Sequence, residues 1–197
     1  MKTYAINEFF FSLQGEGIRS GTPNIFLRFA GCNLQCSKEN EGFDCDTEFT
    51  SFKRWNSSEI LSELKKLNSA GWIILTGGEP TLQVDDELVS ALKGQDYKLA
   101  IETNGLQKVP SGIDWITVSP KTAEHTLRQL KANELKYVRA YGQGIPKPGV
   151  EADHYLISPA FEAGYLPPKN LEWCIQLVKD NPRWRLSLQT HKFMNIR

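Results

Sequence analysis

The sequence lacks any apolar run close to the roughly 20 residues that a membrane-spanning helix needs, so a membrane partner is not expected. It also lacks an excess of charge of one sign, because 23 basic residues balance 23 acidic ones. Without a basic stripe, the chain is not expected to bind nucleic acid, and a small molecule or another neutral protein is favoured as its substrate. The N-terminal segment contains acidic residues and does not resemble a secretory signal peptide, which indicates a cytoplasmic protein.

Repeats, low-complexity tracts and long linkers are also absent, which predicts a single domain over residues 1–197. Cysteine is scarce, and three of the 4 cysteines, Cys32, Cys36 and Cys45, lie close together in the sequence. In a reducing cytoplasm such a group favours a metal site over a disulfide framework. Cys174 lies far away, within a segment that reads as an amphipathic helix, so we interpret it as a buried core residue.

Short, mostly apolar runs recur along the chain, and they are typical of strands that are buried on both faces of a parallel sheet. The predicted strands cover Tyr4–Phe11, Asn24–Phe29, Trp72–Leu75, Lys98–Glu102, Trp115–Val118, Leu135–Arg139, Tyr155–Ser158 and Arg185–Gln189.

Helices are fewer than strands. Asn56 with Glu59 forms a capping-box pattern before a helix, and further helices are predicted over Asp85–Leu92 and Asn170–Lys179. Thr122–Ala132 is a candidate for a fourth, short helix. A complete eight-unit barrel needs about 250 residues. We therefore expect an α/β fold, a partial, open (β/α) barrel of about six parallel strands with about three well-formed helices.

Ligands of such sheets bind at the carboxyl ends of the strands. Four segments with distinctive chemistry are predicted to lie at or just beyond these ends: 32–45, Thr76–Pro80, Thr103–Gly105 and Ser119–Lys121.

The cysteines have the spacing Cys-x3-Cys-x8-Cys. Three local thiolates without an evident fourth would leave one iron of a 4Fe–4S cluster open to bind another molecule. The long spacer costs only about 1.2 kcal/mol of extra loop closure, against about 10–16 kcal/mol for binding a structural metal. The alternatives are a zinc site completed by His125, His154 or His191, and three unrelated buried cysteines.

The segment Thr76–Pro80 follows an apolar strand and contains two adjacent glycines. Glycine lets the backbone approach a ligand closely or adopt positive φ, and Glu79 offers an acceptor-only carboxylate suited to an ammonium group. Strand-to-helix turns often contain glycine, so this turn alone is weak evidence for a ligand site.

Together, the cysteine loop and this turn resemble the radical S-adenosylmethionine superfamily and, within it, the 7-carboxy-7-deazaguanine synthases. The cysteine spacing is longer than the commonest radical pattern, Cys-x3-Cys-x2-Cys, but the family has members with a lengthened loop. The motifs that carry the resemblance are Phe11–Gly17, Phe26–Leu34, Cys45–Thr47, Thr76–Pro80, Glu102–Gly105, Ser119–Lys121 and Leu188–Lys192.

The resemblance implies a role for individual residues. Cys32, Cys36 and Cys45 would ligate the 4Fe–4S cluster, and Thr47 would ligate Mg²⁺. S-adenosylmethionine would contact Asp44, Asp46, Gly78, Glu79, Ser119, Pro120 and Lys121. The substrate would contact Leu13, Gln14, Gly15, Glu16, Arg28 and Thr76.

Several of these residues also have simpler interpretations. Arg28 suits a carboxylate, which a guanidinium binds with two parallel hydrogen bonds, but it could be a surface charge at a strand end. Lys121 could extend to solvent, and Asp46 with Thr47 could cap a turn. Ser158-Pro159 stands where the family has a Gln-Pro step, so its role is open.

The activity implied is the radical-mediated ring contraction of 6-carboxy-5,6,7,8-tetrahydropterin to 7-carboxy-7-deazaguanine with loss of ammonia, a lyase step in queuosine-type deazapurine biosynthesis. The resemblance further implies a homodimer and a flavodoxin-like reductant. Two other functions share part of the pattern: an activase that generates a glycyl radical on a partner protein, and a non-catalytic zinc-binding module. The segment Gln14–Gly17 and the Cys45–Thr47 step favour the pterin enzyme.

Overall fold

The computed structural model describes residues 2–37, 39, 45, 48, 50–67 and 71–197, and these residues form one nine-stranded sheet. The order of strands across the sheet is β3-β1-β2-β4-β5-β6-β7-β8-β9. The strands are β1 (Tyr4–Leu13), β2 (Pro23–Phe29), β3 (Lys53–Trp55), β4 (Trp72–Gly77), β5 (Lys98–Thr103), β6 (Trp115–Val118), β7 (Lys131–Arg139), β8 (Glu151–Pro159) and β9 (Trp184–Leu186).

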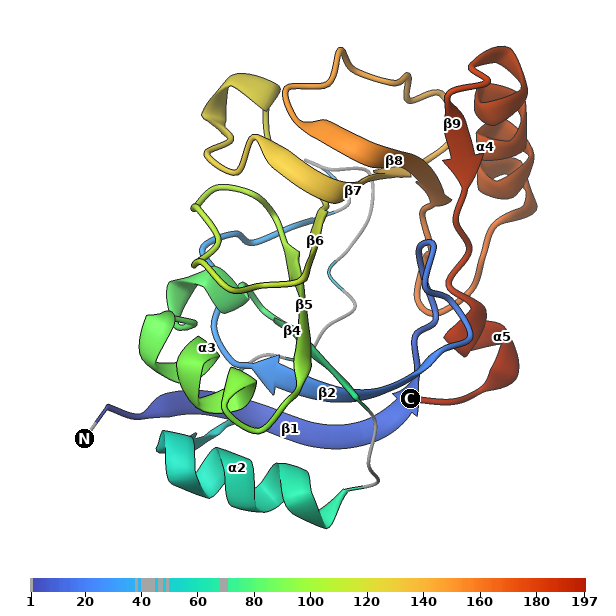
Figure 1. Cartoon of the computed structure of the whole chain (residues 1–197). Coiled ribbons are helices and arrows are strands. Elements are labelled where there is room, and N and C mark those ends of the chain that lie inside the picture. Colours follow the sequence, from blue (N-terminus) through green and yellow to red (C-terminus); the bar gives the residue numbers. More distant parts are fainter. Residues whose placement is uncertain (1, 38, 40–44, 46–47, 49, 68–70) are drawn as a thin grey trace.

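The sheet is mixed, because β1 pairs antiparallel with both β2 and β3, whereas every pair from β2–β4 to β8–β9 is parallel. The expectation of an α/β fold is confirmed, but about six strands was too few. Figure 1 shows that the sheet curves from β1 to β9. The two edge strands are β3 and β9.

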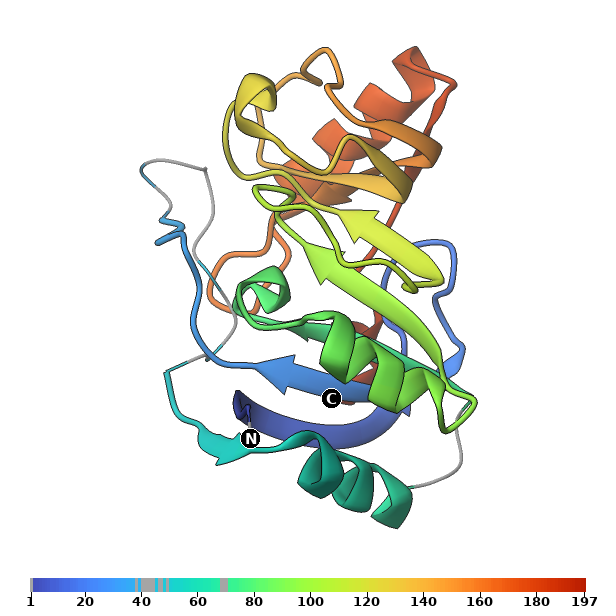
Figure 2. The ribbon, with the colours of Figure 1, turned by 60° about the vertical axis from the view of Figure 1, so that its left-hand side comes forward.

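The longer helices lie outside this curve (Figures 1 and 2). The helices α2 (Ser57–Lys66) and α3 (Asp86–Lys93) lie on the outer side of the first half of the sheet, and α4 (Pro168–Asp180) packs against β8 and β9. These are the helices of eight or more residues in the described ranges, as predicted. Short elements complete the chain: η1 (Pro80–Leu82), η2 (Glu124–Thr126) and α5 (Thr190–Met194).

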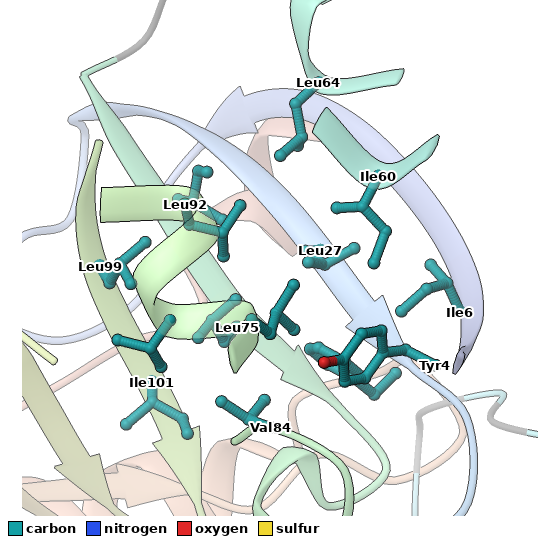
Figure 3. Close-up of a cluster of buried hydrophobic side chains, with 14 of the residues drawn as sticks. Tyr4, Ile6, Leu27, Ile60, Leu64, Leu75, Val84, Leu92, Leu99 and Ile101 are labelled. Carbon is teal, nitrogen blue, oxygen red and sulfur yellow. The ribbon is translucent and has the colours of Figure 1, made fainter. Parts of the chain in front are cut away.

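The strands bury apolar side chains on both faces, which is why their sequences read as continuous apolar runs. Leu75 and Leu99 point outward into the cluster that Ile60, Leu64 and Leu92 complete from the two helices (Figure 3). On the inner face, Ile74 and Ala100 pack with Phe10 and Phe26, whose rings stack with centroids 4.8 Å apart. Towards the carboxyl ends of the strands, the inner face becomes polar.

A second outer cluster lies under α4 and contains Tyr137, Ile157 and Cys174. Cys174 is fully buried there, which confirms its interpretation as a core residue. None of the helices in the described part of the chain is long and apolar enough to cross a membrane.

The start of α2 depends on a reciprocal cap, as its sequence predicts. The Asn56 side chain accepts from the Glu59 backbone N–H (3.0 Å), and the Glu59 carboxylate accepts from the Asn56 N–H (2.8 Å). Replacing Asn56 with alanine is expected to lower the free energy of unfolding by about 1 kcal/mol. Urea titration of Asn56→Ala beside Ser58→Ala, which lies in the same turn outside the cap, checks this. Equal losses in both variants would contradict a specific cap.

Two local predictions were wrong, and two short elements were not predicted. Thr122–Ala132 is not a helix: it contains the three-residue η2, and the N–H groups of Arg128 and Gln129 donate to Gly105 O (2.8 and 3.1 Å) instead of to a preceding turn. The last strand ends at Leu186, earlier than Gln189. Finally, β3 and α5 were not predicted, because three to five residues carry too little periodicity for detection.

Candidate functional site

The carboxyl ends of β4 to β8 open into a cavity of ≈ 440 Å³, a size typical of small-molecule sites. All four segments predicted to lie at strand ends line it in part, and so do residues at the ends of β7 and β8. From the segment Thr103–Gly105, the lining residues are Thr103 and Asn104. Parallel strands bring these residues together because their carboxyl ends share one edge of the sheet.

Cys32, Cys36 and Cys45 all line this cavity, and no cysteine of the chain forms a disulfide. The Leu34 N–H lies 3.4 Å from the Cys32 sulfur and donates to it. Burial raises the pKa of the Cys32 thiol, so a bound cation would be needed to stabilise its thiolate.

The donor set fits an iron–sulfur cluster better than zinc. Three thiols share one cavity, whereas no histidine stands among the described residues that line it, although a zinc site would need a fourth ligand. Within the described residues no three His, Cys, Asp or Glu side chains are assembled as a metal site. Joint ligation by the three cysteines therefore stays a prediction.

The glycine pair of the turn after β4 makes close contact with the chain that leads to Cys32. The Gly78 N–H donates to Phe29 O (3.0 Å), and the Glu79 N–H donates to Gly31 O (2.9 Å). A β-carbon on Gly78 would lie 2.0 Å from Gly31 O. Glycine is therefore needed here for the approach of one backbone to another, in addition to any approach to a ligand.

Glu79 is 1% exposed and joins two strand ends. Its carboxylate accepts from the Thr81 N–H (3.0 Å) and hydroxyl (2.6 Å), the Thr103 hydroxyl (2.7 Å) and the Asn104 N–H (2.7 Å). Three of these donors bind Oε1 and one binds Oε2, and Glu79 lines the cavity. A carboxylate oxygen can accept more than one hydrogen bond, so Oε2 retains capacity for a ligand.

Glu16 also lines the cavity, and Lys136 of β7 donates to its Oε2 while Gln189 donates to its Oε1 (2.8 Å). Burial by itself would raise the pKa of the Glu16 carboxyl, but the Lys136 ammonium and the hydrogen bonds lower it to about 2. Glu102 accepts from Thr76 (3.0 Å) and from Gln14 (2.9 Å). The inner face thus carries a connected polar network.

The structure places the other predicted residues as follows. Thr76, Ser119 and Lys121 line the cavity, and the Lys121 ammonium donates to Ser119 Oγ (2.6 Å), so its side chain turns towards the cavity. Arg28 is not part of the lining: its Nε donates to Glu8 (2.9 Å). The remaining residues outside the lining are Leu13, Gln14, Gly15 and Pro120. The predictions for Asp44, Asp46 and Thr47 lie outside the described residues.

Sequence reasoning assigned no role to Glu102, Lys136 or Gln189, which line the cavity. A signal for Lys136 was present: Glu134 and Lys136 alternate with the buried Leu135 and Tyr137 in one strand. Charges at every second position of a strand whose other positions are apolar indicate a polar site on one face.

Comparisons with known proteins agree with this geometry. Residues 13–131 match the family described as a 4Fe-4S single cluster domain. The chain is 41% identical over 193 residues to the 7-carboxy-7-deazaguanine synthase of Bacteroides thetaiotaomicron, with 98% of both chains covered. It is 38% identical over 217 residues to that of Burkholderia multivorans, with 98% and 99% covered. The crystal structure of QueE from Escherichia coli matches with a TM-score of 0.72 at 25% identity, covering 96% of this chain and 95% of that one. The chain therefore belongs to the 7-carboxy-7-deazaguanine synthase family.

Proposed function

We propose that this chain catalyses the radical-mediated conversion of 6-carboxy-5,6,7,8-tetrahydropterin to 7-carboxy-7-deazaguanine with release of ammonia. The observation that carries the proposal is one cavity of ≈ 440 Å³ lined by the three clustered cysteines, the turn after β4 and Glu16. Such a cavity suits a small-molecule substrate, whereas a glycyl-radical activase needs room for a peptide.

Cys32, Cys36 and Cys45 would hold a 4Fe–4S cluster. When bound, the cluster and S-adenosylmethionine together supply the radical that abstracts hydrogen from the substrate. The residues of the turn after β4 and of the segment after β6 would bind S-adenosylmethionine beside it: Gly78, Glu79, Ser119, Pro120 and Lys121, with Asp44 and Asp46.

The pterin would lie towards the opposite wall, against Thr76 and Glu16. Arg28 would need to turn from Glu8 to reach the substrate carboxylate, and Leu13, Gln14 and Gly15 would support the segment that holds Glu16. Thr47 would contribute a hydroxyl ligand to Mg²⁺, which favours oxygen donors and keeps several waters.

The charges around the cavity suit an anionic substrate. Among the described lining residues, the carboxylates of Glu16, Glu79 and Glu102 are matched by the ammonium groups of three lysines. Each of these carboxylates accepts hydrogen bonds from protein donors, which partly compensate its negative charge. Lys136 is paired with Glu16, and the ammonium groups of Lys121 and Lys192 can then face the carboxylates of the bound ligands.

Further properties belong to the same proposal. The curved, open sheet would act as a partial barrel that encloses the reaction, and residues 1–197 would form a single radical S-adenosylmethionine domain. We also propose that the enzyme is a cytoplasmic homodimer that receives electrons from a flavodoxin-like protein.

The proposal is tested by anaerobic reconstitution with iron and sulfide, followed by incubation with dithionite, S-adenosylmethionine and the carboxylated tetrahydropterin. We expect brown protein, 5′-deoxyadenosine and 7-carboxy-7-deazaguanine, identified by mass spectrometry. Deoxyadenosine without the deazaguanine would refute the substrate while retaining the radical chemistry. A colourless protein that carries one zinc would refute both.

A further inference from the structure

Lys136 is a buried cation in the wall of the cavity. It lies in the middle of β7 and is 8% exposed, between Leu135 and Tyr137, which point into the outer core. Lysine is rarely buried unless it is paired, because removing an ammonium group from water is costly. An ammonium group at this position therefore needs an anionic partner that offsets the cost of its burial.

That partner is Glu16, and each oxygen of its carboxylate accepts a hydrogen bond from the protein. Lys136 donates to Oε2 and Gln189 donates to Oε1 (2.8 Å). A carboxylate has about four acceptor positions, and these two bonds occupy one on each oxygen. Because Glu16 also lines the cavity, its remaining acceptor positions are available to a ligand on that side.

The segment that carries Glu16 is itself fixed, so the carboxylate has a defined place. The Gly17 N–H donates to Ser187 Oγ (2.9 Å), and the Ile18 N–H donates to Glu134 Oε1 (2.7 Å). A β-carbon on Gly17 would lie 2.5 Å from the Glu134 carboxylate. One strand, β7, thus holds both the backbone of this segment and the side chain of Glu16.

We propose that Lys136 is a positioning residue that acts through Glu16, fixing the charge and the orientation with which this carboxylate accepts hydrogen bonds from the N–H groups of the pterin. This inference rests on the proposed function. A reduced aminopterin offers several N–H donors along its pyrimidine ring, and an ionised carboxylate accepts from them with both oxygens. A protonated Glu16 would present a donor where the ligand also donates.

The surroundings explain why a cation is needed. Besides Lys136, the charged or titratable groups that act on the pair are Glu102 from β5, Glu134 from β7 and His191 from α5. Burial and two neighbouring carboxylates both disfavour a further negative charge. Without Lys136, Glu16 would therefore take up a proton at a higher pH than its present pKa of about 2.

The test measures binding rather than turnover. The reconstituted protein with S-adenosylmethionine, but without a reductant, is titrated anaerobically with 6-carboxy-5,6,7,8-tetrahydropterin by calorimetry at about pH 8 and about pH 6. In Lys136→Met we expect the Kd of the pterin to rise about tenfold at the higher pH, which is the effect of one weakened hydrogen bond to a charged group. At the lower pH we expect Kd to rise by a further factor of about ten, because Glu16 then takes up a proton.

Two further variants test whether Lys136 acts through Glu16, contacts the pterin directly or only maintains the structure of the protein. Glu16→Gln keeps the shape of the side chain without the charge, and in that background Lys136→Met is expected to add no loss and no pH dependence. Lys131→Met, an exposed lysine in the same strand, should bind as the unmodified chain does.

Equal losses from Lys136→Met in both backgrounds at both pH values would overturn the inference. If Lys136→Met fails to fold, Lys136→Arg carries the test: retained charge should keep binding independent of pH, and pH-dependent binding would overturn the role. Failure of the unmodified chain to bind the pterin, with S-adenosylmethionine still bound, would overturn the proposed function and this inference with it.

Discussion

Replacing Gly78 with alanine is expected to abolish formation of 7-carboxy-7-deazaguanine and to destabilise the reconstituted enzyme. The added β-carbon would lie 2.0 Å from Gly31 O and 3.2 Å from the Cys32 N. These are backbone atoms, so no change of rotamer relieves the overlap, and the turn after β4 must separate from the cysteine segment. We expect a loss of about 3 kcal/mol or more in the free energy of unfolding. Product analysis and thermal unfolding measure the two effects.

A matched control is Gly144→Ala, because a β-carbon there meets no atom within 4 Å and its backbone needs no positive φ. This variant should retain activity and stability. If Gly78→Ala retained both as well, close packing of the turn on the cysteine segment would not be required for the site.

Replacing Cys45 with alanine is expected to remove most of the bound iron and to abolish both 5′-deoxyadenosine and 7-carboxy-7-deazaguanine. Cys45 is exposed and lines the cavity with Cys32 and Cys36, and two thiolates cannot replace three around one cluster. Iron and sulfide analysis after anaerobic reconstitution gives the readout, with visible absorbance as a second measure.

The fourth cysteine provides the control for this experiment. Cys174 is fully buried in α4, and burial raises the pKa of its thiol to about 12, so it stays an inert thiol. Cys174→Ala should lower stability by roughly 1–2 kcal/mol through the lost packing, while iron content and both products are retained. A fully active Cys45→Ala, or loss of iron from Cys174→Ala, would contradict the ligand assignment.

The core strands could be predicted because burial on both faces leaves a continuous apolar run. Ile73 to Leu75 is such a run, with Ile73 and Leu75 in the outer cluster and Ile74 in the inner one. The antiparallel edge was harder to predict, because β3 has three residues and its first two are exposed. Pairing with β1 makes it a strand, and that pairing is a contact distant in sequence.

The residues of the site also fall into those that could be predicted from the sequence and those that could not. The cysteines and the turn Thr76–Pro80 were found because each is a short motif whose chemistry lies in consecutive residues. Glu102 and Gln189 lie in segments that contributed to the resemblance but were given no role there, and Lys136 lies outside these segments. They join Glu16 and Gln14 through side chains that are 88 to 173 residues apart in sequence.

The class of fold, the group of three thiols, the glycine-rich turn and the family resemblance could all be read from the order of the residues. These features depend on residues that are close together in the sequence, because strand periodicity, loop spacing and backbone freedom are set by near neighbours. Tertiary structure alone decided that Gly78 lies against Gly31, that Glu79 joins two strand ends and that Lys136 holds Glu16. These contacts depend on which strands are neighbours and which face each side chain occupies, and that is set by the packing of the whole sheet.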